Sequence, residues 1–112
     1  MKKLSFAAFA LALSVSAASA AGLEGTYSGT VTQSNGAPFE QSYTVSKVTS
    51  NSALINGSNG KGSGSTTARR DGNRLTFGKA TTRTLTINGN TATLTGRNVA
   101  NGATLQGTLT KH

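Results

Sequence analysis

Asn-Gly and Asp-Gly dipeptides recur between segments in which apolar and polar residues alternate, and this pattern constrains the fold more than any other feature. The dipeptides are Asn35-Gly36, Asp71-Gly72, Asn88-Gly89 and Asn101-Gly102. Such dipeptides favour the tight turns of β-hairpins, and alternation with a period of two is typical of half-buried strands. The pattern therefore predicts an all-β fold built from sequential antiparallel hairpins.

The turns also predict which residues face one another across each hairpin. We take the last three dipeptides as the central residues of two-residue turns, and Ser34-Asn35-Gly36 as a three-residue loop with a left-handed glycine. The expected opposite pairs are Tyr27 with Tyr43, Val31 with Phe39, Ala68 with Leu75, Arg69 with Arg74, Leu85 with Ala92, Leu94 with Leu109, and Gly96 with Gly107. One face of each hairpin is then mostly apolar or glycine, as a half-buried sheet requires.

Eight strands account for the chain after its N-terminal segment. They are expected near residues 23–33, 38–48, 52–57, 65–70, 74–78, 82–87, 91–99 and 104–110. Residues 57–65 are mostly Gly, Ser and Asn and are expected to form a flexible loop. Eight sequential strands can close into an up-and-down barrel, which removes exposed sheet edges. We predict such a closed barrel, with a two-sheet sandwich as the alternative.

The first 20 residues have the pattern of an export signal. Lys2 and Lys3 form a positive start, an apolar stretch runs over residues 4–15, and Ala18-Ser19-Ala20 is a small-x-small cleavage site. The apolar stretch is shorter than the ~20 residues that span a bilayer. We expect a signal peptide at residues 1–20, a single barrel domain at residues 21–112, and a bacterial periplasmic or secreted location.

The exported part is basic and has no cysteine. Loss of Lys2 and Lys3 lowers the number of Lys and Arg from 11 to 9, against 3 acidic residues, so the net charge is +6. A basic exported domain favours anionic partners: a small anionic molecule, a lipid, a glycan or an acidic protein. Plain solubility is the alternative explanation. The sequence has no specific nucleic-acid motif, and it does not determine the oligomeric state.

Residues Ala21 to Tyr27 read Ala-Gly-Leu-Glu-Gly-Thr-Tyr and resemble the opening strand of calycin barrels, the avidins and lipocalins. Those proteins carry Gly-x-Trp there, and Tyr27 stands in the Trp position. The resemblance implies an eight-stranded meander that binds a ligand at its mouth. It does not imply biotin, because avidin-type sites stack the ligand between tryptophans and this chain has none.

The chain offers few side chains for catalysis or metal binding. His112 is the only histidine and the last residue, and Glu24, Glu40 and Asp71 are the only acidic residues. Asp71 is explained as the first residue of its turn, and both glutamates fall on polar faces. Metal sites need clustered His, Cys or carboxylates. We therefore predict a protein that is not an enzyme and uses no metal and no cofactor.

A basic hairpin is the first candidate for binding. Arg69 and Arg74 are expected directly opposite on a polar face, where like charges are destabilising unless an anion relieves them. Arg70 adjoins them, and Lys61 precedes them in the predicted loop. This hairpin would grip an acidic partner, and the alternative is a solvated tip with weakly coupled side chains.

The barrel interior is the second candidate. Arg83 shares the parity of the inward-facing Leu85, so it either binds an interior anion or extends to the barrel rim. A ligand cavity would be lined by Tyr27, Tyr43, Phe77 and Leu94. Thr-x-Thr repeats at 82–86, 91–95 and 108–110 would form an outward hydroxyl lattice for glycan or ice, or would reflect strand preference alone.

Three classes of function fit these features. The first is a non-enzymatic binding barrel of the bacterial cell envelope, with a small or anionic ligand at its mouth or on the basic hairpin. The second is an inhibitor of a lytic enzyme with an acidic cleft, since Gly62-Ser63-Gly64-Ser65 and the nearby arginines are loosely similar to loops of periplasmic lysozyme inhibitors. The third is a structural component of the envelope or matrix.

Overall fold

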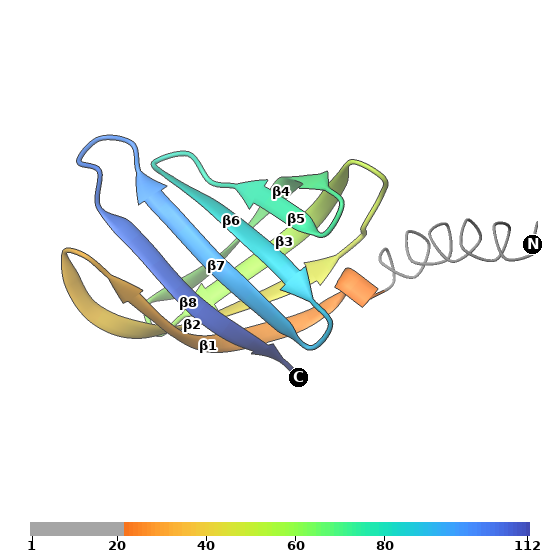
Figure 1. Cartoon of the computed structure of the whole chain (residues 1–112), viewed down its shortest axis with the longest axis horizontal. Coiled ribbons are helices and arrows are strands. Elements are labelled where there is room, and N and C mark those ends of the chain that lie inside the picture. Colours follow the sequence, from red (N-terminus) through yellow and green to blue (C-terminus); the bar gives the residue numbers. More distant parts are fainter. Residues whose placement is uncertain (1–21) are drawn as a thin grey trace, which may run out of the picture.

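The computed structural model describes residues 22–112, which form a closed antiparallel β-barrel (Figure 1). The strands are β1 (Gly25–Gln33), β2 (Gly36–Ser46), β3 (Ser52–Asn59), β4 (Gly62–Asp71), β5 (Arg74–Phe77), β6 (Thr81–Asn88), β7 (Thr91–Asn98) and β8 (Thr104–Lys111). Each strand pairs with its sequence neighbours, and β1 pairs with β8. The predicted up-and-down barrel is confirmed, and the sandwich is wrong. The predicted signal peptide, residues 1–20, lies outside the described residues.

The β1–β2 hairpin has the predicted register. Tyr27 faces Tyr43, and Val31 faces Phe39. The loop itself differs from the prediction, because Gln33 pairs with Gly36 and the register shifts between Val31 and Gln33. Gly36 is not left-handed. The shift leaves an extra residue on β2 next to Pro38, and a bulge is a place where a sheet tolerates proline.

The β4–β5 hairpin is shifted by two residues from the predicted register. Asp71 pairs with Arg74, so the loop consists of Gly72 and Asn73. Gly72 has a φ of 65°, and a type II′ turn places a glycine of positive φ at its first loop position. The Asn73 side-chain amide donates to the carbonyl of Ile87 at 2.8 Å. The predicted pairs of Ala68 with Leu75 and of Arg69 with Arg74 are therefore wrong.

The β6–β7 hairpin has the same turn and the same shift. Asn88 pairs with Thr91, and Gly89 has a φ of 64° at the first loop position. Leu85 consequently faces Leu94. The predicted pair of Leu85 with Ala92 is wrong, because the prediction placed the loop one residue earlier. A shift of two residues keeps every side chain on its predicted face, because side chains alternate with a period of two.

Asn98 organises the β7–β8 connection. Its side-chain Oδ1 accepts hydrogen bonds from the backbone amides of Ala100 at 2.9 Å and Asn101 at 3.1 Å. The backbone amide of Asn98 donates to the carbonyl of Ala103 at 2.8 Å. The loop therefore spans residues 99–102, two more than predicted. The resulting pairs are Leu94 with Gly107 and Gly96 with Leu105, which correct the predicted pairs of Leu94 with Leu109 and of Gly96 with Gly107.

Residues 57–65 form a hairpin, so the predicted flexible loop is wrong. β3 and β4 pair as far as Asn59 and Gly62, and Gly57 faces Gly64. Asn59 Oδ1 accepts a hydrogen bond from the Lys61 amide at 2.9 Å and holds the turn at Gly60-Lys61. Low-complexity composition misled the prediction, because backbone pairing needs no particular side chain.

Two glycines let β1 and β8 approach closely where the barrel closes. A Cβ on Gly107 would lie 2.7 Å from the carbonyl oxygen of Thr30, and a Cβ on Gly29 would lie 2.6 Å from that of Thr108. Both contacts are with backbone atoms of the neighbouring strand. This seam therefore requires glycine on each side.

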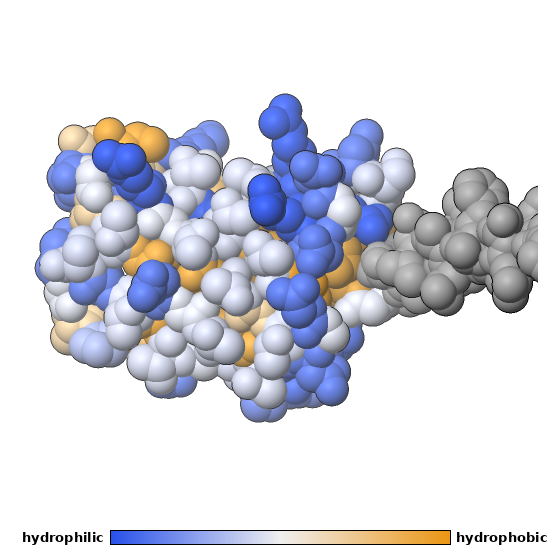
Figure 2. All heavy atoms as spheres, in the orientation of Figure 1, coloured by the Kyte–Doolittle hydropathy of each residue, from blue (hydrophilic) through white to orange (hydrophobic). Residues whose placement is uncertain are grey.

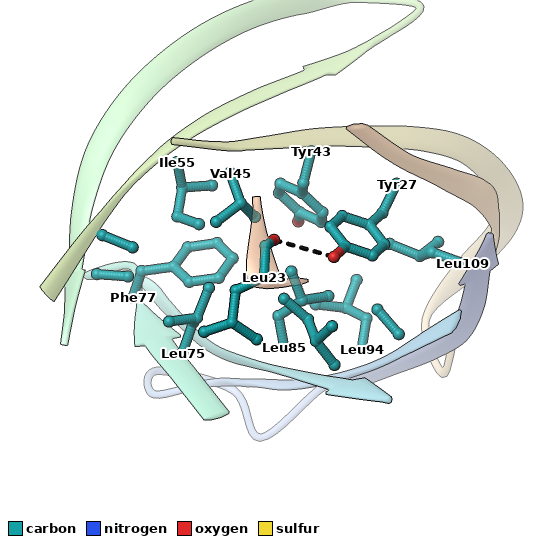
Figure 3. Packing of buried hydrophobic residues seen from close by; sticks show 14 of the residues in the cluster. Leu23, Tyr27, Tyr43, Val45, Ile55, Leu75, Phe77, Leu85, Leu94 and Leu109 are labelled. Atoms are coloured by element: carbon teal, nitrogen blue, oxygen red, sulfur yellow. Dashed lines mark hydrogen bonds between the residues drawn. The ribbon is translucent and has the colours of Figure 1, made fainter. Parts of the chain in front are cut away.

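The two ends of the barrel differ. The closed end carries residues 22–24 and the β2–β3, β4–β5 and β6–β7 connections, and the open end carries the other four connections (Figure 1). Leu23 is buried at the closed end, and the Tyr27 hydroxyl donates to its carbonyl at 2.9 Å (Figure 3). Apolar side chains fill the interior beside them. Toward the open end the inward positions become polar or glycine, as at Gln41, Gly57 and Arg83.

Candidate functional site

A pocket of about 440 Å³ lies toward the open end of the barrel. Residues of β2, β3, β4, β5 and β6 line it, together with the β3–β4 turn and Gly78. Ile55 and Phe77 contribute apolar surface, and the Phe77 ring meets the Tyr43 ring edge to face, with centroids 5.4 Å apart. The pocket therefore combines an apolar, aromatic wall with polar groups from neighbouring strands.

Arg83 contributes a half-buried positive charge to this pocket. It lies on β6 between Phe77 of β5 and Gly96 of β7, on the inward face that its parity predicts. A Cβ on Gly78 would lie 3.7 Å from its Nη1 atom, which places the guanidinium beside the β5–β6 connection. Within residues 22–112 no salt bridge or hydrogen bond engages this guanidinium. Its donors are therefore free for a ligand in the pocket.

Tyr43 directs a hydroxyl into the same space. Its side chain is only 4 % exposed, and burial raises the pKa of its hydroxyl above the usual value, while the positive charge of Arg83 lowers that pKa in part. No completely buried side-chain polar atom in residues 22–112 lacks a hydrogen-bond partner. Since the Tyr43 hydroxyl bonds to none of these residues, it is not completely buried, and Tyr43 is one of the residues that line the pocket.

Gln41 is a buried polar residue of the pocket wall that the sequence prediction missed. Its side-chain amide donates to the carbonyls of Ser58 at 2.9 Å and Ser42 at 3.1 Å, and its oxygen accepts from Asn59 at 3.5 Å. The available signal was its inward parity, two residues before Tyr43 on β2. These bonds hold the wall of the pocket in one arrangement.

The charge in the pocket is entirely positive. Arg83 and Lys61 are the only charged side chains among the described residues that line it. No carboxylate of residues 22–112 lines this pocket: Glu40 lines a neighbouring hollow together with Lys61 and accepts a hydrogen bond from Thr30, and Glu24 accepts one from the Val48 amide at 3.4 Å. The field in the pocket therefore favours an anion.

The structure separates the predicted basic group. Arg69 faces Thr76, Arg74 faces Asp71, and both lie at the closed end, whereas Lys61 lies at the open end. The predicted grouping of Lys61 with these arginines is therefore wrong. Strands that run the length of the barrel separate residues that are close in sequence.

Arg70 and Tyr27 have structural contacts at the closed end. Arg70 donates to the carbonyls of Gly72 and Thr49, both at 2.7 Å, and so ties the β4–β5 turn to the β2–β3 connection. Tyr27 is completely buried and does not line the pocket. Leu94 is also outside its lining. Of the predicted site residues, Tyr43, Lys61 and Arg83 therefore come together, with Phe77 beside them.

The outer face over β6, β7 and β8 is mostly of intermediate hydropathy (Figure 2), because threonine occupies many outward positions. Thr93 faces Thr108, and a shallow hollow there is lined by Thr, Gln and Gly residues. The β7–β8 loop carries the apolar Val99, which is 71 % exposed. A glycan- or ice-binding role for the threonine lattice stays a prediction.

Residues 22–112 contain no cluster of three or more His, Cys, Asp or Glu side chains arranged to hold a metal ion. In the same part of the chain no helix is long and apolar enough to cross a membrane. Comparison with known proteins finds no matching family model and no similar curated protein. The candidate site is therefore defined by its own geometry: Arg83, Lys61, Tyr43 and an apolar wall at the open end.

Proposed function

We propose that this chain is an exported, non-enzymatic binding protein of the bacterial cell envelope that takes a small anionic ligand into the open-end pocket. The observation that carries the proposal is the unengaged, half-buried guanidinium of Arg83 in a pocket without carboxylates. Hydrogen bonds from an ionised donor to a carboxylate are stronger than those between neutral groups. The guanidinium of Arg can also donate two parallel N–H···O bonds to the two oxygens of a carboxylate. Partial burial also reduces screening by salt.

The rest of the pocket favours a ligand with an apolar part beside its charge. Phe77 and Ile55 offer apolar contact, while the Tyr43 hydroxyl and the Lys61 ammonium offer further polar contacts near the mouth. Binding sites for small molecules usually combine a mostly apolar lining with a few placed polar groups. An amphiphilic carboxylate or sulfonate suits this combination.

The eight-stranded barrel agrees with a relationship to the calycins, which we include in the proposal. A ligand at the mouth of such a barrel is what the resemblance of residues 21–27 implies. An inhibitor of an acidic-cleft enzyme is the alternative, but it predicts a sealed interior. The pocket beside Arg83 favours the binding barrel instead.

Anilinonaphthalene sulfonate tests the proposal, because this probe joins a sulfonate to aromatic rings and fluoresces when bound. The full chain is expressed in a bacterium, purified in the form that the cell produces, and titrated with the probe. We expect Arg83→Gln to weaken binding about tenfold or more, from the loss of a charge-assisted hydrogen bond of about 1.5–3 kcal/mol.

Arg74→Gln is the matched control, since Arg74 is exposed and lies at the closed end. It removes the same charge and should leave the affinity unchanged. Equal binding by the Arg83→Gln variant and the unmodified protein would disprove the assignment of the pocket. Native mass spectrometry of the purified protein then identifies any anion that it retains.

A further inference from the structure

The wall of the barrel is incomplete between β4 and β5. β3 pairs with β4 from Gly62 to Arg69, whereas β5 pairs with β4 only from Arg69 to Asp71. β5 ends at Phe77, and the chain turns away at Gly78. In the described part of the chain, β4 from Gly62 to Ala68 therefore pairs with β3 on one side and has no strand on the side that faces β5.

Three residues of β4 direct their backbone groups toward this opening. The Arg70 amide donates to the Asn51 carbonyl at 2.9 Å, on the β3 side of the strand. Backbone groups alternate in direction along a paired strand. Ser63, Ser65 and Thr67, which have the opposite parity to Arg70, therefore direct their N–H and C=O groups away from β3 and into the opening.

The free edge and the pocket are one continuous surface. Ser63 and Ser65 line the pocket together with Gly78 and Arg83 on the other side of the opening. The edge segment carries no Lys, Pro or inward charge, which are the usual means of protecting an edge strand. An unprotected edge beside a cationic pocket is suited to an extended chain that carries negative charge.

We propose that the opening binds an extended peptide segment that carries a carboxylate and adds to the barrel as a strand beside β4. Its main chain pairs with Ser63, Ser65 and Thr67, and its carboxylate contacts Arg83 or Lys61. Strand addition of this kind obtains affinity from main-chain hydrogen bonds and selectivity from side-chain contacts. The inference rests on the anion preference of the proposed function and specifies the ligand as a peptide.

Charge decides between this occupant and a second copy of the chain. The chain carries 3 acidic residues against 11 Lys and Arg, and its own copies would repel at a cationic opening. An acidic peptide instead meets the positive charges of Lys61 in the β3–β4 turn and of Arg83 in the pocket. The carboxylate is either a side chain or a C-terminus, and the two sources are separated by experiment.

Fluorescence anisotropy with labelled hexapeptides tests the inference on the full chain, purified as above. The peptides alternate Thr and Val and differ only in charge: one Asp with an amidated C-terminus, no Asp with a free C-terminus, or one Lys with an amidated C-terminus. A fourth peptide keeps the Asp but is N-methylated at alternate residues, which removes main-chain donors from one edge.

Thr67→Pro removes one amide that faces the opening and spares the β3 ladder, and Thr67→Ala is its matched control. Thr67 is exposed and does not line the pocket, so the two variants differ only in the backbone amide and the proline ring. We expect the Ala variant to bind the better acidic peptide like the unmodified protein. The Pro variant should bind at least tenfold more weakly, with unchanged binding of anilinonaphthalene sulfonate and an unchanged melting temperature.

The outcomes separate the two proposals. Equal peptide binding by the Pro and Ala variants, no loss on N-methylation, or equal binding of the Lys peptide would overturn strand addition of an acidic segment. Binding of the sulfonate probe that depends on Arg83, without any peptide binding, would overturn the inference and leave the proposed function standing. If binding of the sulfonate probe does not depend on Arg83, both proposals lose their basis.

Discussion

Gly107→Ala tests the closure of the barrel. The added methyl group would lie 2.7 Å from the carbonyl oxygen of Thr30 and 3.1 Å from the Cα of Val31, both backbone atoms of β1. These atoms cannot rotate away, so β1 and β8 must separate locally. Overpacking of this kind costs about 1–3 kcal/mol, and the alanine returns about 0.4–1 kcal/mol by restricting the unfolded chain.

The net expectation is a loss of about 1–2 kcal/mol in the free energy of unfolding. For a domain of this size that lowers the melting temperature by roughly 5–15 °C, which circular dichroism and urea denaturation both measure. Gly60→Ala is the control, since nothing lies within 4 Å of its Cβ and its φ is not positive. If Gly107→Ala melts at the temperature of the Gly60→Ala variant or above it, the close approach at the seam is refuted.

Three further predictions concern the tyrosines. Tyr27→Phe removes the donor to the buried Leu23 carbonyl and should lower the free energy of unfolding by about 1–3 kcal/mol in urea denaturation; an unchanged urea midpoint would show that this bond does not hold the closed end. Burial raises the pKa of Tyr43 and Tyr27, so the stability that they contribute is complete below pH 10 and is lost as the pH rises through their folded pKa values. Arg83→Gln should raise the pKa of Tyr43 further, seen in the ultraviolet absorbance of tyrosinate, and a lowered or constant pKa would contradict their proximity.

The sequence predicted the strands and their faces better than their registers. Alternation determines which side chains point inward, and shifts of two residues leave that unchanged. The position of a turn is less determined, because Asp71-Gly72 fits two arrangements. Both residues can form the two-residue loop, or Asp71 can end the strand and Gly72 can be the first residue of the loop. The structure adopts the second arrangement, in which Asn73 bonds to Ile87.

The candidate site was predictable only in part. Arg83 and Tyr43 followed from parity, since both fall on inward positions near the mouth. Lys61 was grouped with Arg69 because the two are close in sequence, but eight residues along an extended strand span roughly 26 Å. The opening beside Ser65 had no signal in the sequence, because it results from the shortness of β5.

The seam between β1 and β8 also bears on how the barrel folds. It joins Tyr27 to Lys111, positions 84 residues apart, whereas the other described strands pair with their sequence neighbours. Hairpins with short loops close quickly, and pairing across a long chain segment is slow. We expect seam closure to be the rate-limiting step of folding. Until it occurs, the chain is an open sheet whose first and last strands are free to pair with another copy.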